Sequence, residues 1–218
     1  GATTLRPEHI KINENGYVQF NFLGKDSVEW NKEVQLREDA VRNLKEFVSL
    51  AQSPVFDGVR SGHVKRFLGE VLPGLTAKVF RTYHASRVVR EHLEKSGVTR
   101  DDAMIKKKEA ATLANLQAAI ECNHKKQLPK NWDERIAKQK QRLEAAKAKN
   151  TEKAKERAKE LRTKLELMKK TGNYNLGTSL KSYIDPRLYY NWGKKVDYDW
   201  KLYYPATLQR KFSWVEKN

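Results

Sequence analysis

The chemistry available to this sequence centres on Tyr183, in the segment LGTSLKSYIDPR (residues 176–187) that follows a long stretch rich in lysine, glutamate and alanine. A tyrosine that attacks a phosphodiester needs neither a metal ion nor a cofactor. However, its phenol has a pKa of about 10 and is a poor nucleophile at neutral pH. The anionic phosphate also repels nucleophiles unless fixed cations neutralise it. Such a site therefore requires arginines, whose planar guanidinium matches two phosphate oxygens, and a proton donor for the leaving oxygen.

Three other residues could supply these groups: Arg81, His124 and Lys25. Arg81 lies among hydrophobic residues of a predicted helix, His124 follows the end of another, and Lys25 is at the tip of a predicted hairpin. Each residue also has a structural interpretation when taken alone. Tyr183 could be a packing aromatic, Arg81 an ion-pair partner at the edge of the core, His124 a residue that interacts with helix-end carbonyls, and Lys25 a solvated turn residue.

A metal centre or a cysteine nucleophile is not indicated by the sequence. Cys122 and His124 are two positions apart, with no third ligand and no carboxylate partner nearby. Metal sites and cysteine-histidine pairs both require such partners. We therefore expect no metal and no required cofactor.

The overall charge points to a polyanionic partner. The 218 residues include 44 Lys and Arg against 27 Asp and Glu, which gives a net charge of +17. Such an excess favours nucleic acid or an anionic membrane surface. No apolar run approaches the roughly 18 residues that span a bilayer, and no signal peptide opens the chain. The single cysteine fits an intracellular compartment, so we expect DNA rather than a membrane as the partner.

The first part of the chain combines strands and helices. Residues 8–31 alternate in the manner of a small antiparallel meander, with Asn15-Gly16 as a hairpin turn. Residues 36–122 show helical periodicity in several segments, the last of which we expect to begin with Thr99 as its N-cap and to stop near 123.

Residues 131–171 differ in composition from the rest. They are rich in Lys, Ala, Glu and Arg, and a heptad spacing of apolar residues runs through Ala154, Ala158, Leu161, Leu165 and Met168. Asn150-Thr151 is a natural break and a new N-cap. We therefore predict two antiparallel helices that form a charged hairpin arm, with one long helix as the competing interpretation.

The last segment, residues 172–218, regains aromatic residues and is too short to build a core of its own. We expect a small helical unit that packs on the body of the protein. The predicted fold class is mainly α with a small N-terminal antiparallel β-meander (α+β).

These segments, taken in order, resemble the catalytic region of the eukaryotic-type type IB DNA topoisomerases. The resemblance rests on LRPEHI (5–10), FLGKDS (22–27), the segment around Arg81, Asn123-His124, the basic linker, and LGTS with YIDP (176–186). Each landmark alone is weak, but together they follow the family order over almost the whole chain. The resemblance implies the DNA breaking-rejoining fold, with a catalytic core at 1–130, a linker arm at 131–171 and a tyrosine-bearing C-terminal domain at 172–218.

The resemblance also implies roles for the candidate residues. Tyr183 would attack the scissile phosphate and form a 3′-phosphotyrosyl intermediate. Arg81 and His124 would stabilise the pentacoordinate transition state, and Lys25 would be the general acid. Rotation of the free strand would relax supercoils before religation, without ATP or metal. We expect Lys78, Lys125, Thr178 and Ser182, which neighbour these residues, to contact DNA. The protein would act as a monomer on double-stranded chromosomal DNA, in the nucleus of a eukaryote or the nucleoid of a prokaryote.

Two departures from the family pattern affect these expectations. The family site uses two arginines, and the first lies upstream of the segment that matches residues 1–10. We therefore expect a fragment with weak or absent relaxation activity. Ser182 stands where many eukaryotic members have asparagine, which puts sensitivity to camptothecin-type poisons in doubt.

Two other functions remain open from the sequence. A tyrosine recombinase uses a similar set of Arg, Lys, His and Tyr residues, but it usually carries a second His or Trp near the tyrosine, has no long coiled arm and reads specific sites. A non-catalytic DNA-binding module could use the charged arm alone.

Overall fold

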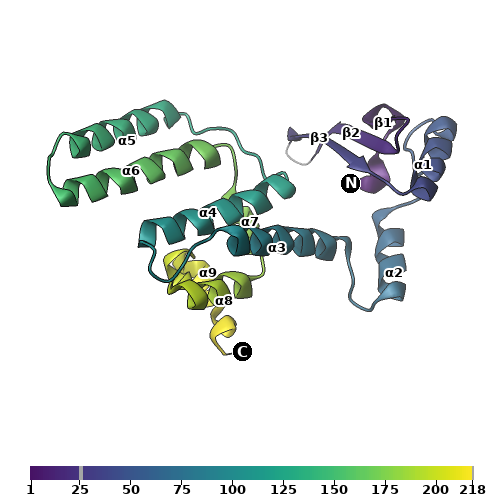
Figure 1. Cartoon of the computed structure of the whole chain (residues 1–218). Helices are drawn as coiled ribbons and strands as arrows, with labels where there is room; N and C mark the ends of the chain where they lie inside the picture. The colour runs from purple at the N-terminus through teal and green to yellow at the C-terminus, as the bar shows by residue number, and fades with distance from the viewer. Residues whose placement is uncertain (25–26, 218) are drawn as a thin grey trace. The chain divides into compact units, whose positions relative to one another are not determined.

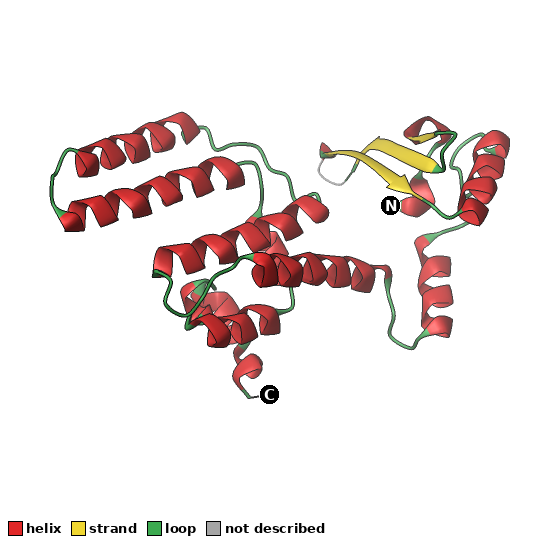
Figure 2. Cartoon of the chain, viewed as in Figure 1, coloured by secondary structure: helices red, strands yellow, loops and turns green. Residues whose placement is uncertain are grey.

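The computed structural model describes residues 1–24 and 27–217, which form two compact units, Gly1–Val79 and Phe80–Asn218. Helices predominate, and the described strands all belong to the first unit, in agreement with the predicted α+β class (Figure 1, Figure 2). Lys25 lies outside the described residues. The predicted division at 130 and 171 stays a prediction.

The first unit contains a three-stranded antiparallel sheet in the order β1-β2-β3. β1 (Ile10–Ile12) pairs with β2 (Tyr17–Leu23) through a turn that contains Gly16, whose φ of 77° favours glycine. β3 (Glu29–Gln35) is longer than predicted because it pairs along the whole of β2, from Glu29 opposite Leu23 to Gln35 opposite Tyr17. The predicted meander is confirmed, but it extends to residue 35.

Two helices complete this unit. α1 (Glu38–Leu50) buries Val41 and Leu44, which pack with Val18 of the sheet and with Val55. α2 (Ser61–Val71) has no buried residue among those described, although its sequence has an apolar stripe. The core of the first unit therefore lies between the sheet and α1.

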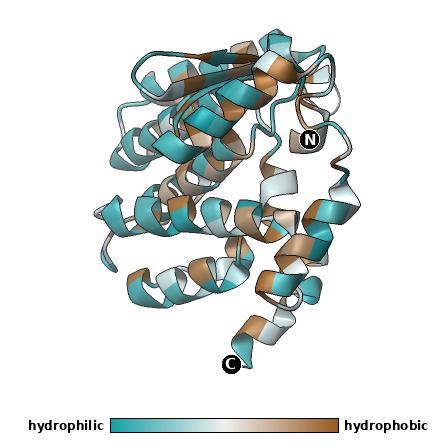
Figure 3. Cartoon of the chain, turned by 90° about the vertical axis from the view of Figure 1, so that its right-hand side faces the viewer, coloured by the Kyte–Doolittle hydropathy of each residue, from teal (hydrophilic) through white to brown (hydrophobic). Residues whose placement is uncertain are grey.

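The second unit is built on a pair of helices. α3 (Ala77–Lys95), which begins at the end of the first unit, buries Ala85, Val89 and Leu93. α4 (Met104–Glu121) contributes mainly alanines to the same core, namely Ala110, Ala111, Ala114 and Ala118. Hydrophobic and hydrophilic residues alternate along the helices, as expected for helices with one covered side (Figure 3). The exposed residues of α3 include two large aromatic residues, Phe80 and Tyr83.

The start of α4 differs from the prediction. Thr99 is not its N-cap: the helix begins at Met104, after Ala103. The Asp102 carboxylate instead accepts hydrogen bonds from the backbone N–H and the hydroxyl of Thr99, which closes a separate turn. Asp and Thr satisfy turns as readily as helix ends, so the local pattern did not distinguish the two. The predicted end of this helix is confirmed.

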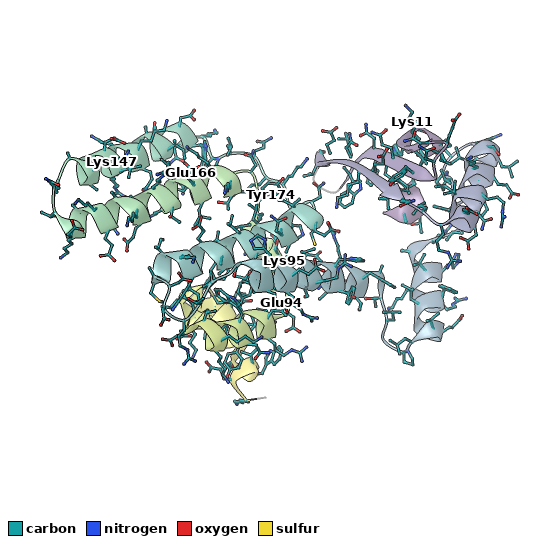
Figure 4. The ribbon with its side chains drawn as sticks, in the orientation of Figure 1. Lys11, Glu94, Lys95, Lys147, Glu166 and Tyr174 are labelled. Carbon is teal, nitrogen blue, oxygen red and sulfur yellow. The ribbon has the colours of Figure 1, made fainter. Side chains whose placement is uncertain are left out.

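The charged segment forms a hairpin of two helices, not one long helix. α5 (Trp132–Lys147) and α6 (Glu152–Thr171) lie side by side (Figure 1) and bury Leu143, Leu161 and Leu165 between them. Thr151 caps α6 by accepting a hydrogen bond from the N–H of Ala154. Charged residues such as Lys147 of α5 and Glu166 of α6 lie along the arm (Figure 4).

The C-terminal segment packs on α3 and α4, as predicted. It consists of α7 (Leu176–Ser182), α8 (Pro186–Val196), α9 (Ala206–Lys211) and two short 3-10 turns at Trp200–Leu202 and Ser213–Glu216. Its aromatic residues join the alanine-rich core of α4: Tyr189, Trp192, Tyr198, Trp200, Tyr204 and Phe212 are buried there. The bulky side chains fill the volume that the alanines leave. This packing fixes α7 against α4.

Candidate active site

Tyr183 lies at the carboxyl end of α7, where the helix stops. Its backbone N–H donates to the carbonyl of Ser179, and its φ and ψ of −132° and −21° end the helix there. The next residue, Ile184, is buried in the core, whereas the Tyr183 side chain is only partly buried. The tyrosine is therefore anchored by its backbone, and its side chain stays partly accessible.

Ser86 of α3 holds the backbone on the carboxyl side of this tyrosine. The Ser86 hydroxyl accepts a hydrogen bond from the N–H of Asp185 at 3.0 Å and donates to the carbonyl of Tyr183 at 3.4 Å. Asp185 in turn caps α8 by accepting from the N–H of Arg187. The position of Tyr183 thus depends on α3 as well as on α7.

Arg81 lies on α3, five residues before Ser86, and points to the tyrosine. Its Cζ is 5.3 Å from the centre of the Tyr183 ring. Nη2 donates a hydrogen bond to the carbonyl of Cys122 at 2.5 Å, which ties the guanidinium to the end of α4. Arg81 is an exposed residue, so it is not embedded in the core. A cation fixed beside a phenol and accessible from outside is suited to holding an anion.

His124 reaches the same tyrosine from the end of α4. Asn123 has a φ of 53°, in the left-handed region that asparagine tolerates, and this turns the chain after the helix. The N–H of His124 then donates to the carbonyl of Ala119, and its own carbonyl accepts from Asn175 at the start of α7. The rings of His124 and Tyr183 lie with their centres 5.0 Å apart. Backbone hydrogen bonds to both α4 and α7 therefore set the place of this imidazole.

The His124 ring is neutral at physiological pH. Burial, and secondly the positive charge of Arg81, lower the pKa of His124 from 6.5 to about 4. Its Nδ1 atom lies 2.7 Å from the hydroxyl of Ser179, which is completely buried. The site therefore combines one fixed guanidinium, one neutral imidazole and a phenol, with hydrogen-bond donors gathered where an anionic oxygen could bind.

The structure brings together three of the four predicted catalytic residues, Arg81, His124 and Tyr183, all in the second unit. The fourth, Lys25, is outside the described residues. Of the predicted DNA contacts, Lys125 is exposed, and its backbone forms an isolated antiparallel β-bridge with Tyr174 at the base of the arm. Figure 4 labels that tyrosine. Thr178 and Ser182 lie on α7 with Tyr183, and Lys78 belongs to the first unit.

Three supporting residues were not among the predicted site residues: Ser86, Ser179 and Asn175. The Asn175 side chain accepts from the N–H of Thr178 and caps α7, which a search for helix N-caps could have found. Ser179 lies four positions before Tyr183, one helical turn away, and that spacing was also readable. No signal in the sequence links Ser86 to a residue so distant along the chain.

Within the described residues, no three His, Cys, Asp or Glu side chains are grouped so that they could hold a metal ion. None of the helices described in the structure has the length and apolarity needed to cross a membrane. The expectation of an active site without cofactor stays a prediction.

Comparisons with known proteins find similarity to DNA topoisomerase I over almost the whole chain. Residues 1–160 match the model of the eukaryotic DNA topoisomerase I catalytic core, and residues 155–218 match that of the C-terminal topoisomerase domain. DNA topoisomerase 1 of Caenorhabditis elegans is 32% identical over 250 residues, covering 99% of this chain and 31% of the relative. DNA topoisomerase 1 of Drosophila melanogaster is 32% identical over 240 residues (99% and 24%), and that of Homo sapiens 31% over 255 residues (99% and 33%). The chain spans a third or less of the length of these relatives.

Proposed function

We propose that this chain, which belongs to the eukaryotic DNA topoisomerase I family, cleaves and rejoins one strand of double-stranded DNA through Tyr183. The observation that carries the proposal is the convergence of Arg81, His124 and Tyr183 from α3, the end of α4 and α7. A fixed guanidinium and an imidazole beside a phenol are suited to an attack on an anionic substrate.

The proposed reaction is a transesterification. The Tyr183 phenol loses its proton to solvent as its oxygen forms a bond to the scissile phosphorus, while the bond from phosphorus to the 5′ oxygen breaks. The products are a 3′-phosphotyrosyl bond and a 5′-hydroxyl strand. Arg81 and the neutral His124 donate hydrogen bonds to the non-bridging oxygens, where negative charge builds up in the transition state. We assign protonation of the leaving oxygen to Lys25.

Relaxation of supercoils follows from the same scheme. The free 5′-hydroxyl strand rotates around its partner, and then attacks the phosphotyrosyl bond to reverse the first step. The phosphodiester energy is kept in the protein–DNA bond, so the reaction requires neither ATP nor a metal ion. We assign DNA contacts to Lys78, Lys125, Thr178 and Ser182, and we propose that the protein works as a monomer with chromosomal DNA in the nucleus.

A suicide substrate tests the nucleophile. A duplex nicked just beyond the cleavage site loses its short 5′-hydroxyl fragment, so the covalent adduct accumulates in a single turnover. We expect Tyr183→Phe to abolish this adduct because it removes the attacking oxygen. Tyr190→Phe is the matched control, since it removes a phenolic oxygen from α8 and should leave the adduct unchanged. An adduct of normal yield from Tyr183→Phe would refute the assignment.

A further inference from the structure

Ser179 contacts two of the three converging residues, His124 and Tyr183. Its side chain is fully buried, with 0% of the residue exposed, and its hydroxyl oxygen lies 2.7 Å from Nδ1 of His124. Its backbone carbonyl accepts hydrogen bonds from the N–H groups of both Tyr183 and Ile184. One residue of α7 therefore contacts the imidazole through its side chain and the tyrosine through its backbone.

The hydrogen bond to Nδ1 decides what the other ring nitrogen can do. A neutral imidazole carries one N–H, and the partner of one nitrogen determines which nitrogen holds it. If Nδ1 donated its proton to Ser179, Nε2 would present a lone pair to the phosphate, and the two would repel. If Ser179 donates to Nδ1, the proton lies on Nε2 and can be shared with a phosphate oxygen.

We propose that Ser179 is a positioning residue that donates its hydroxyl proton to Nδ1 of His124 and so keeps the imidazole in the tautomer with its proton on Nε2, toward the DNA phosphate. This inference rests on the proposed function, because the phosphate defines which tautomer is useful. The lowered pKa of His124 supports it, since an imidazolium would donate from both nitrogens and need no selection.

The hydrogen bond can be measured without DNA. In protein labelled with ¹⁵N in histidine, the ring nitrogen shifts and their couplings to carbon-bound protons distinguish the two neutral tautomers. His124→Gln identifies the signals of this ring among the five histidines. We expect the Nε2–H tautomer in the unaltered protein and a shift of the Nδ1 signal in Ser179→Ala. An Nδ1–H tautomer in the unaltered protein would overturn the inference.

A double-mutant cycle separates tautomer selection from a merely structural effect. Partners that orient metal-binding histidines typically affect activity by about 10–100-fold, and we apply the same range to His124. We therefore expect Ser179→Ala to slow single-turnover cleavage at least about tenfold, and Ser179→Thr, which keeps the hydroxyl, to restore most of the rate. In a His124→Gln background the glutamine amide donates a hydrogen bond and has no tautomers to select. Ser179→Ala should therefore lower the cleavage rate less than about twofold there. An equal reduction of the cleavage rate by Ser179→Ala in both backgrounds would overturn the proposal.

The control is Ser96→Ala, which removes a serine that is also hydrogen-bonded within the second unit, to the carbonyl of Leu93 and the N–H of Val98, at the end of α3. It should leave the cleavage rate and the His124 ring signals unchanged. The two ideas fail differently: an undiminished adduct from Tyr183→Phe refutes the proposed function, whereas the wrong tautomer of His124 refutes this inference alone.

Discussion

Tyr183, His124 and Arg81 make their contacts through different physical means. The tyrosine is held by its backbone, through Ser179 and Ser86. The imidazole is held by burial and by hydrogen bonds to α4 and α7, and the guanidinium by the carbonyl of Cys122. The sequence predicted which residues form this group but not how each is held, because the holding groups are backbone atoms and serine hydroxyls with no distinctive pattern.

The lowered pKa of His124 predicts a pH dependence of stability. The unfolded chain binds a proton to this imidazole below about pH 6.5, whereas the folded protein binds it only near pH 4. Between these values the unfolded state holds more protons, so the free energy of unfolding falls as the pH falls. The contribution is complete above about pH 6.5 and is lost progressively down to about pH 4.

Urea unfolding of the unaltered protein and of His124→Gln at pH 7 and pH 4.5 measures this contribution. The unaltered protein should lose more stability than the variant as the pH is lowered. Burial also lowers the pKa of His92, but that histidine is present in both proteins and cancels in the comparison. Identical pH slopes for the two proteins would contradict the prediction.

At the scale of elements, α7 is the part on which the site depends most. It is short, begins at Leu176 and ends at Ser182, just before Tyr183, and carries Ser179 in its middle. Buried Asn115 of α4 donates to the carbonyl of Leu176, and Asn175 joins the helix start to His124. A helix this short has little stability of its own, so its caps and its packing decide whether it forms.

The cap of α7 gives a direct prediction. Asn175→Ala removes the side-chain acceptor for the N–H of Thr178 and should cost about 0.5–2 kcal/mol of stability. Asn175→Ser is the matched control because serine caps helices about as well as asparagine. Hydrogen exchange of the α7 amides should accelerate in the alanine variant only. Equal protection in both variants would show that packing alone holds the helix.

Gly193 of α8 packs closely against the turn that follows the helix, so this position tolerates little change. A Cβ on Gly193 would overlap the backbone carbonyl oxygen of Tyr198. Gly193→Ala should therefore destabilise the protein by about 1–3 kcal/mol, although alanine is the better helix former.

Gly69→Ala in α2 is the comparison for this variant, because an added Cβ there meets no atom within 4 Å. It should be neutral or stabilising by up to about 1 kcal/mol. Urea unfolding of both variants measures the difference, and equal behaviour would mean that the turn after α8 relaxes freely.

At the scale of the whole molecule, the two main features are the net positive charge and the helical hairpin arm. The excess of Lys and Arg gives +17. In the second unit, backbone hydrogen bonds join the segments before and after the arm next to the site. The N–H of Lys126 donates to the carbonyl of Asn173, and the N–H of Asn175 donates to the carbonyl of His124. The arm therefore leaves the body at the same place where the imidazole and α7 are fixed. The family match favours a topoisomerase over a tyrosine recombinase. It also favours a eukaryotic over a prokaryotic origin.

The charge predicts steeply salt-dependent DNA binding. Each neutralised phosphate releases condensed counterions, which lowers the logarithm of affinity by about 0.9 per tenfold rise in salt. Titration of a labelled duplex, followed by fluorescence anisotropy at several salt concentrations between about 50 and 200 mM, measures the slope. A flat response would argue against phosphate contacts as the main source of affinity.

The sequence by itself determined the family, the helical hairpin and the identity of the three converging residues, because spacing, composition and ordered motifs are local properties of the chain. It could not place Ser86 beside Tyr183, or show that Arg81 is exposed and tied to Cys122, or reveal Ser179 on the imidazole. These contacts join residues far apart in the chain, and only the packing of α3, α4 and α7 around a common core brings them within hydrogen-bonding distance.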